Sequence, residues 1–238
     1  MLNLRAIVFV VLGVAFATPA LAAQDLSIYR EFRLGASLPV VAKQARLNPA
    51  EAKTLYQRPA LIQELEWQAV YLDPKRTADS VRSILFSFYN GALFRLLITY
   101  DRERTEGLSA EDVIEAISTK YGLATKPGVE MTIVTTHLAS DALDGEKIIT
   151  ERNEKVIARW EDAQYSYNLM QSYPSAPFTL AIYVKRLEAL AQTAVAEATR
   201  LDKEEAPQRE KARQAANATA AAAKQAEARR ANKPPFRP

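Results

Sequence analysis

The chain has no cysteine, a single histidine and only 7 glycines among 238 residues. Without cysteine, it cannot form disulfides, use thiol chemistry, ligate a metal through sulfur or carry a lipid on an N-terminal cysteine, so its core alone must hold the fold together. None of the glycines falls in a P-loop or dinucleotide-binding pattern, which excludes the nucleotide sites that depend on such loops.

The single histidine, His137, could in principle serve a Ser-His-Asp triad or a metal site. No nucleophile-elbow motif and no ligand-spaced partner accompanies it in the sequence. We therefore expect His137 to be a structural or surface residue, and we expect no catalytic residue, no metal site and no cofactor.

The N-terminal segment has the organisation of a secretory signal peptide. Arg5 is the only charge before an apolar run over residues 6–17, and Pro19 and the small-x-small sequence Ala20-Leu21-Ala22 follow. This predicts a signal peptide at 1–22 and a mature chain from Ala23 or Gln24. The run is shorter than the about 20 residues of a membrane span. We expect a periplasmic or secreted protein that is not transmembrane once processed.

The formal charge of +3 hides an asymmetry between the body of the chain and its C-terminal tail. Residues 206–238 contain eight basic residues, two acidic ones and 12 alanines, whereas the body carries a net charge of −4. This low-complexity tail is predicted to be helical or disordered. Its basic residues, Arg229 and Arg230 among them, could contact anionic lipid head groups or another polyanionic envelope component. A solvated, purely solubilising tail is the alternative.

Between the signal peptide and the tail, residues 24–205 are predicted to form an α+β domain. Capping and proline signals predict helices over 37–46, 48–58 and 109–121, and a stripe of Leu and Ala predicts a longer helix over 186–205, interrupted by Pro207. Runs of β-forming residues predict strands over 60–70, 83–89, 92–100, 129–136, 155–160, 164–172 and 178–185. The expected fold is helices packed on an antiparallel meander sheet.

The strongest local signal is Asn90-Gly91 between two β-forming runs. Both residues tolerate the positive φ of a type I′ turn, which predicts a two-residue hairpin. Its simplest register places Phe88 opposite Leu93, Phe86 opposite Arg95 and Ile84 opposite Leu97 on one face, with Leu85, Phe94, Leu96 and Ile98 on the other. Both faces are apolar, so the hairpin is expected in the middle of the sheet.

A repeat with an offset of 72 residues runs through this domain. The sequence Gly35-x-Ser37-x3-Val41 matches Gly107-x-Ser109-x3-Val113, and the same offset takes the Asn90-Gly91 turn onto residues 162–163. This predicts two units, about 28–101 and 102–185, each a helix followed by three strands.

Residues 32–41, Phe-Arg-Leu-Gly-Ala-Ser-Leu-Pro-Val-Val, resemble the G-x-[ST]-x-x-x-V helix start of small outer-membrane-assembly lipoproteins. Helices followed by a meander, twice over, resemble the β-lactamase-inhibitor-like architecture. The resemblance implies a binding module that works through its surfaces and has no catalytic residues. The lipid-bearing cysteine of those lipoproteins is absent here.

Two groups of side chains are candidates for a site. Trp160, Tyr165 and Tyr167 should share one face of a second hairpin, where they could stack on sugars or receive a partner's side chain, with burial in the core as the alternative. Carboxylates gather over residues 101–112 and at 161–162, where a glycosidase pair or solvated caps and loops would explain them.

These observations favour a non-enzymatic exported envelope protein that acts as a binding or protein-interaction module for an unknown ligand or envelope protein. A secreted hydrolase with an unrecognised carboxylate site is the alternative. The segment 37–55 has the spacing of a DNA-binding helix-turn-helix, but an export signal argues against nucleic acid as a partner.

Overall fold

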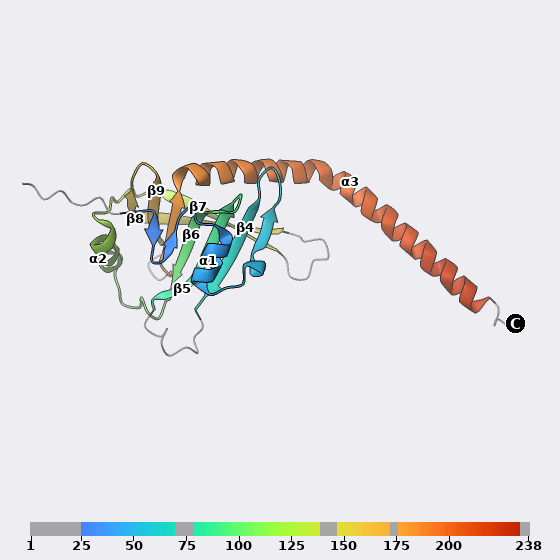
Figure 1. The fold of residues 1–238 in the computed structure, drawn as a ribbon, viewed down its shortest axis with the longest axis horizontal. Helices are drawn as coiled ribbons and strands as arrows, with labels where there is room; N and C mark the ends of the chain where they lie inside the picture. The colour runs from blue at the N-terminus through green and yellow to red at the C-terminus, as the bar shows by residue number, and fades with distance from the viewer. Residues whose placement is uncertain (1–24, 70–78, 139–146, 172–175, 234–238) are drawn as a thin grey trace, which may run out of the picture.

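An antiparallel sheet of eight strands organises the chain into the α+β fold predicted from the sequence (Figure 1). The computed structural model describes residues 25–69, 79–138, 147–171 and 176–233, so the predicted signal peptide lies outside it. The strands are arranged in the order β3-β4-β5-β6-β10-β9-β8-β7. They comprise β3 (Lys53–Tyr56), β4 (Ile62–Gln68), β5 (Val81–Tyr89), β6 (Ala92–Tyr100), β7 (Glu130–Leu138), β8 (Lys147–Glu161), β9 (Tyr165–Gln171) and β10 (Thr179–Val184).

The remaining elements cover this sheet. They are the ribbon of β1 (Ile28–Tyr29) and β2 (Phe32–Arg33), the helices α1 (Leu38–Ala45) and α2 (Ala110–Tyr121), the 3₁₀ turn η1 (Pro49–Glu51) and the helix α3 (Lys185–Asn232). None of the described helices is both long enough and apolar enough to cross a membrane.

The ribbon, α1 and α2 pack on one face of the sheet and enclose the main core. Val41 and Ala42 of α1 and Phe32 of the ribbon lie in one cluster with buried side chains of the central strands. The Phe32 and Phe86 rings meet edge to face, with their centroids 4.7 Å apart. We call this side the apolar face.

The first 20 residues or so of α3 pack on the opposite side, which we call the α3 face. Ala191 and Ala198 contact an apolar cluster from β3, β4 and β6. Beyond this contact α3 leaves the sheet and projects away from it, as Figure 1 shows at the red end of the colour scale.

The central hairpin turns where the sequence predicts. Asn90 and Gly91 have φ values of 48° and 81°, as a type I′ turn requires, and Phe88 is paired with Leu93. The register predicted beyond that pair is wrong. A β-bulge at Phe94 shifts it by one residue, so Phe86 lies opposite Leu96 and Arg95 lies opposite Ser87. The bulge therefore turns Arg95 away from the apolar face.

The helix predicted over 48–58 is also wrong. Asn48 does cap a turn, since its side chain accepts a hydrogen bond from the Ala50 amide, but the turn is only the three residues of η1. The chain then extends as β3 and pairs with β4. The pairing and the burial of Leu55 and Tyr56 under α3 outweigh the local helix signal.

The starts of α1 and α2 agree with the sequence predictions. Ser109 and Asp112 form the predicted capping box of α2, with reciprocal side-chain to backbone hydrogen bonds. Ser37 stands at the N-cap of α1, although its side chain makes no capping hydrogen bond. Gly35 and Gly107, which precede these caps at the 72-residue offset, have φ values of 85° and 81°.

Pro207 does not interrupt α3, contrary to the sequence prediction. The helix runs unbroken through it to Asn232. A proline within a helix removes one backbone hydrogen bond and crowds the preceding turn, so a bend is expected there. Figure 1 shows α3 changing direction as it leaves the sheet.

Candidate functional site

A row of polar side chains crosses the α3 face from strand to strand. Each member is the direct cross-strand partner of the next, so all of them point to the same side of the sheet. From β4 to β8 the row is Glu64, Ser87, Arg95, Tyr183, Ser166 and Glu161. We call it the polar row. The corresponding positions on the apolar face hold large hydrophobic side chains.

Arg95 is the centre of a charged cluster in the polar row. Its guanidinium Nη2 lies 3.6 Å from Oε1 of Glu64, and its Nη1 lies 3.4 Å from Oε1 of Glu188 on α3. The Ser87 hydroxyl donates to Glu64 at 3.2 Å and accepts from Arg95 at 3.4 Å. Gln192, one turn along α3, donates to Glu188 at 3.1 Å. The cluster joins the three strands β4, β5 and β6 to the helix.

The cluster is largely withdrawn from solvent. The side chains of Glu64, Glu188 and Arg95 are 8%, 12% and 21% exposed. Two of its buried atoms, Nε of Arg95 and Oε2 of Glu188, have no hydrogen-bond partner. Burying charged groups that leave hydrogen-bonding atoms unused lowers the stability of a fold. Such an arrangement is therefore more typical of a functional site than of a structural core.

A cavity of about 460 Å³ opens beside this cluster, between α3 and the sheet. Glu64, Arg95 and Glu188 all line it. Its apolar walls come from β3, β4, β6 and α3, and comprise Leu55, Tyr56, Ile62, Phe94, Ala191, Val195 and Ala196. The cavity thus combines an apolar wall with a few converging polar groups, as small-molecule sites do.

Both edges of the sheet contribute to the cavity. Thr132 of β7 lines it together with Leu55 of β3, although these strands are at opposite ends of the strand order. Met131 likewise packs against an apolar cluster that includes Leu97 and Ala181 in the middle of the sheet. The sheet therefore curls over its α3 face, and it encloses the cavity together with α3.

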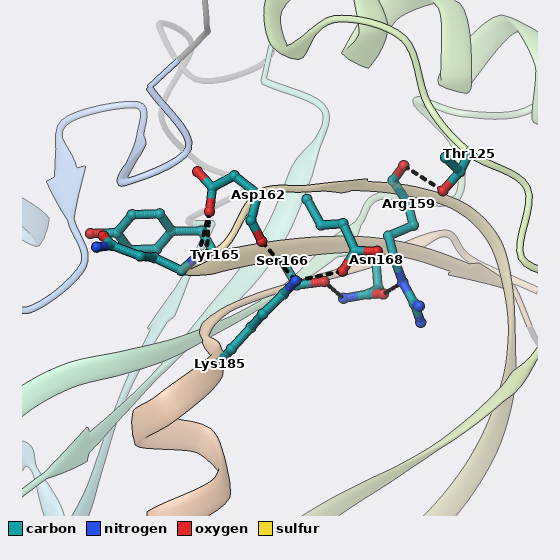
Figure 2. Close-up of polar contacts among 9 residues, drawn as sticks. Thr125, Arg159, Asp162, Tyr165, Ser166, Asn168 and Lys185 are labelled. Atoms are coloured by element: carbon teal, nitrogen blue, oxygen red, sulfur yellow. Dashed lines mark hydrogen bonds and ion pairs between the residues drawn. The ribbon is translucent and has the colours of Figure 1, made fainter.

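A second polar network fastens the start of α3 to the β8–β9 turn (Figure 2). Lys185 donates to the Asp162 carbonyl at 2.7 Å and pairs with Glu161 at the same distance. Asp162 also accepts from the backbone amides of Gln164 and Tyr165, which closes the turn. These contacts place the first turn of α3, and so position Glu188 over Arg95.

Further polar contacts lie beside the start of α3, along β8 and β9. Nε of Arg159 donates to Asn168 at 2.6 Å, and Asn168 donates to Ser166 at 3.0 Å (Figure 2). Asn168 and Ser166 are buried. These polar groups lie on the strands next to the start of α3, and they are hydrogen-bonded where they are buried.

The aromatic residues singled out in the sequence lie elsewhere. Trp160 and Tyr167 are buried in the main core, where the Trp160 indole donates to the Gly122 carbonyl at 2.9 Å and the Tyr167 hydroxyl to the Ile28 carbonyl at 3.0 Å. Tyr165 is partly buried against the same core. Trp160 and Tyr167 therefore present no surface to a partner, which was the alternative considered for them.

The other sequence candidates are more dispersed. Arg229 and Arg230 are exposed on the projecting end of α3. His137 lies in β7 opposite Ile148, and its side chain is outside the described residues. Asp101 and Asp112 accept backbone hydrogen bonds at a turn and a helix start. Among the described residues no group of three or more His, Asp or Glu side chains is placed to hold a metal ion.

Sequence reasoning overlooked the Arg95 cluster, although one signal was present. Arg95 is the only charged residue of the hairpin between residues 83 and 100. A lone charge within an apolar hairpin indicates a buried partner. Its partners are 31 and 93 residues away in the sequence, so only the fold reveals them.

The chain was compared with protein-family models, curated proteins and solved structures, and none of them matches it.

Proposed function

We propose that this chain is a non-enzymatic binding protein of the cell envelope, and that its ligand site is the cavity between α3 and the sheet. The observation that carries the proposal is the charged cluster of Glu64, Arg95 and Glu188 at the wall of a mostly apolar cavity. Replacing such a cluster with hydrophobic residues often stabilises a protein. Its presence is therefore better explained by a ligand that it orients than by stability.

The size of the cavity supports a small-molecule ligand. Sites for such ligands measure roughly 300–1,000 Å³ and are mostly apolar, with a few placed polar groups. A volume of about 460 Å³ lies in the lower part of that range. The enclosing parts, α3 and the two curled sheet edges, meet only in the folded chain.

The envelope location rests on the sequence alone. The predicted signal peptide motivates export, and the basic tail motivates contact with a polyanionic envelope component. In the structure this tail is helical, and its residues from 211 to 233 are exposed. Cell fractionation with N-terminal sequencing tests the location. A chain that begins at Ala23 or Gln24 in the periplasm supports it, and one that retains Arg5 in the cytoplasm refutes it.

A neutral fluorescent probe tests the cavity. N-phenyl-1-naphthylamine should bind the protein saturably with one site per chain, and Ala196→Trp should abolish the binding. Ala196 lines the cavity but is exposed, so tryptophan there can fill the mouth without displacing core residues. Ala216→Trp, on the projecting part of α3, is the matched control. Equal binding by both variants would refute the site.

A secreted hydrolase remains the second candidate, because the cavity does bring two carboxylates together. Glu64 and Glu188 line it, as an acid–base pair would. Arg95, however, contacts both of them and occupies the space where a substrate would have to lie. Turnover of a panel of aryl glycosides and esters that is lost in both Glu64→Gln and Glu188→Gln would establish the hydrolase and overturn the binding function.

A further inference from the structure

The cavity is elongated along α3. The helix residues that line it recur at the spacing of one helix face, and they are Glu188, Ala191, Gln192, Val195, Ala196 and Thr199. The stretch from Glu188 to Thr199 corresponds to about 16 Å of helix, at ~1.5 Å per residue. The long axis of the cavity therefore follows α3.

The width of the cavity is that of a single chain. A volume of about 460 Å³ spread over about 16 Å of helix gives a mean cross-section of roughly 30 Å². One extended hydrocarbon chain fits this cross-section, whereas two chains side by side or the fused rings of a sterol do not. Ala191 and Ala196 leave this space open, because larger side chains at their positions on the wall would fill it.

One end of this long axis is polar. Glu188 is the first lining residue along α3, and its carboxylate contacts Arg95 at 3.4 Å and accepts a hydrogen bond from Gln192 at 3.1 Å. Arg95 also contacts Glu64 on β4 and Ser87 on β5. The polar head of a ligand would therefore meet both hydrogen-bond donors and acceptors at this end.

The other end is apolar in its described walls. Next to Thr199, the last lining residue of α3, Ala198 belongs to one apolar cluster with Leu55 and Tyr56 of β3, which also line the cavity. The Thr199 hydroxyl donates to the Val195 carbonyl of its own helix at 2.9 Å. A hydrocarbon chain gains most from such walls, because it removes their apolar surface from water.

We propose that the cavity binds a single-chain amphiphile, an unbranched alkyl or acyl chain with one polar head. The head lies at the Arg95 cluster, the chain runs along α3, and Thr199 limits the length of chain that the cavity holds. The inference depends on the proposed function, because it names the ligand class for the same cavity.

A series of unbranched alcohols that displace N-phenyl-1-naphthylamine from the full chain tests the proposal. From hexanol to decanol we expect each added methylene to tighten binding about fourfold, because each buries more apolar surface along α3. From dodecanol to tetradecanol we expect no further gain, because the added carbons extend past Thr199. Octanediol, with a hydroxyl at both ends, should bind about tenfold more weakly than octanol, because its second hydroxyl meets the apolar walls.

Thr199→Phe tests whether this residue limits the chain length. A ring at the apolar end should shorten the cavity, so the gain in affinity should end before decanol, while hexanol binds as tightly as it does to the wild type. Thr193→Phe is the matched control. Thr193 is exposed on α3, does not line the cavity, and makes the same hydrogen bond to the carbonyl one turn before it. The control should leave the whole series unchanged.

The outcomes separate this inference from the proposed function. If N-phenyl-1-naphthylamine does not bind the wild type, the ligand site fails and the inference fails with it. If the probe binds and Ala196→Trp abolishes the binding, the site stands. The single-chain inference is then overturned if affinity keeps rising through tetradecanol, if octanediol binds as tightly as octanol, or if Thr199→Phe leaves the series unchanged.

Discussion

The two faces of the central sheet are formed by the same strands but hold their covering helices in different ways. The apolar face is lined by side chains such as Phe86, Phe88 and Ile98, each with no exposed surface, and α1 and α2 pack on it through hydrophobic contact. The α3 face carries the polar row instead, and α3 is held there by ion pairs at Lys185 and Glu188 together with a smaller apolar cluster.

This difference separates the source of stability from the proposed ligand site within one sheet. Hydrophobic burial is the main favourable term in folding, and the apolar face supplies most of it. Buried charges contribute little net stability, so polar groups on the α3 face can serve the proposed ligand site while the other face stabilises the fold. The comparison predicts that substitutions on the apolar face greatly lower the free energy of unfolding. On the α3 face the loss should depend on charge, and neutralising the partner charges as well should restore the stability.

The largest loss of stability is expected for substitutions at the centre of the apolar face. Phe86→Ala removes a ring that has no exposed surface and packs edge to face on Phe32. It should lower the free energy of unfolding by about 3–5 kcal/mol, because it leaves a cavity in a closely packed core. Urea denaturation measures the loss, with the exposed Arg82→Ala on the same strand as control. A cost below about 1 kcal/mol would show that this face is not the main core.

On the α3 face, Arg95→Met should destabilise by about 2–3 kcal/mol, below the 3–5 kcal/mol of a fully buried ion pair because Arg95 keeps some exposure. The loss arises because the substitution removes the cation that Glu64 and Glu188 share. The triple variant Glu64→Gln, Arg95→Met, Glu188→Gln should return to within about 1 kcal/mol of the wild type. A triple variant as unstable as Arg95→Met would mean that shape, not charge, holds this cluster.

The apolar face should also lose stability in alkali. Burial raises the pKa of Tyr121 to about 12 and raises the pKa of Tyr167 still further, above the ordinary value of 10.0. The folded state therefore holds these protons more tightly than the unfolded state. Their contribution is complete below pH 10 and declines as the pH rises toward 12.

Urea midpoints at pH 7, 10 and 11 measure this decline. Tyr167→Phe, which cannot ionise, should show a shallower decline than the wild type, whereas Tyr89→Phe on β5 should not change it. Identical pH profiles for the wild type and Tyr167→Phe would contradict the assignment of the effect to the buried tyrosine.

The smallest change in stability is expected for the part of α3 that projects beyond the sheet and covers neither of its faces. Truncation after Glu205 should change the free energy of unfolding by less than about 0.5 kcal/mol, because the residues removed are almost entirely exposed. Binding of the full chain to anionic vesicles should weaken between low and physiological salt, and the truncated chain should bind poorly at either. A melting temperature that falls steeply on truncation would instead place part of the domain's core beyond residue 205.

The central hairpin shows which structural features the local sequence predicts and which it does not. The turn at Asn90-Gly91 follows from the conformations that these two residues tolerate, so it was predictable. The bulge at Phe94 was not predictable, because its formation depends on how side chains pack on both faces of the sheet. Since a shift of one residue exchanges the two faces of a strand, this single bulge decides that Arg95 lines the cavity.

The sequence by itself determined the α+β class, the I′ turn, the capping box at Ser109 and the separation of a basic tail from an acidic body. Each of these depends on neighbouring residues or on composition. Only the tertiary structure decided that residues 53–56 form a strand, that α3 continues through Pro207, and that Glu64, Arg95 and Glu188 meet. Those outcomes depend on contacts between distant segments, whose combined burial and pairing energies outweigh local preference.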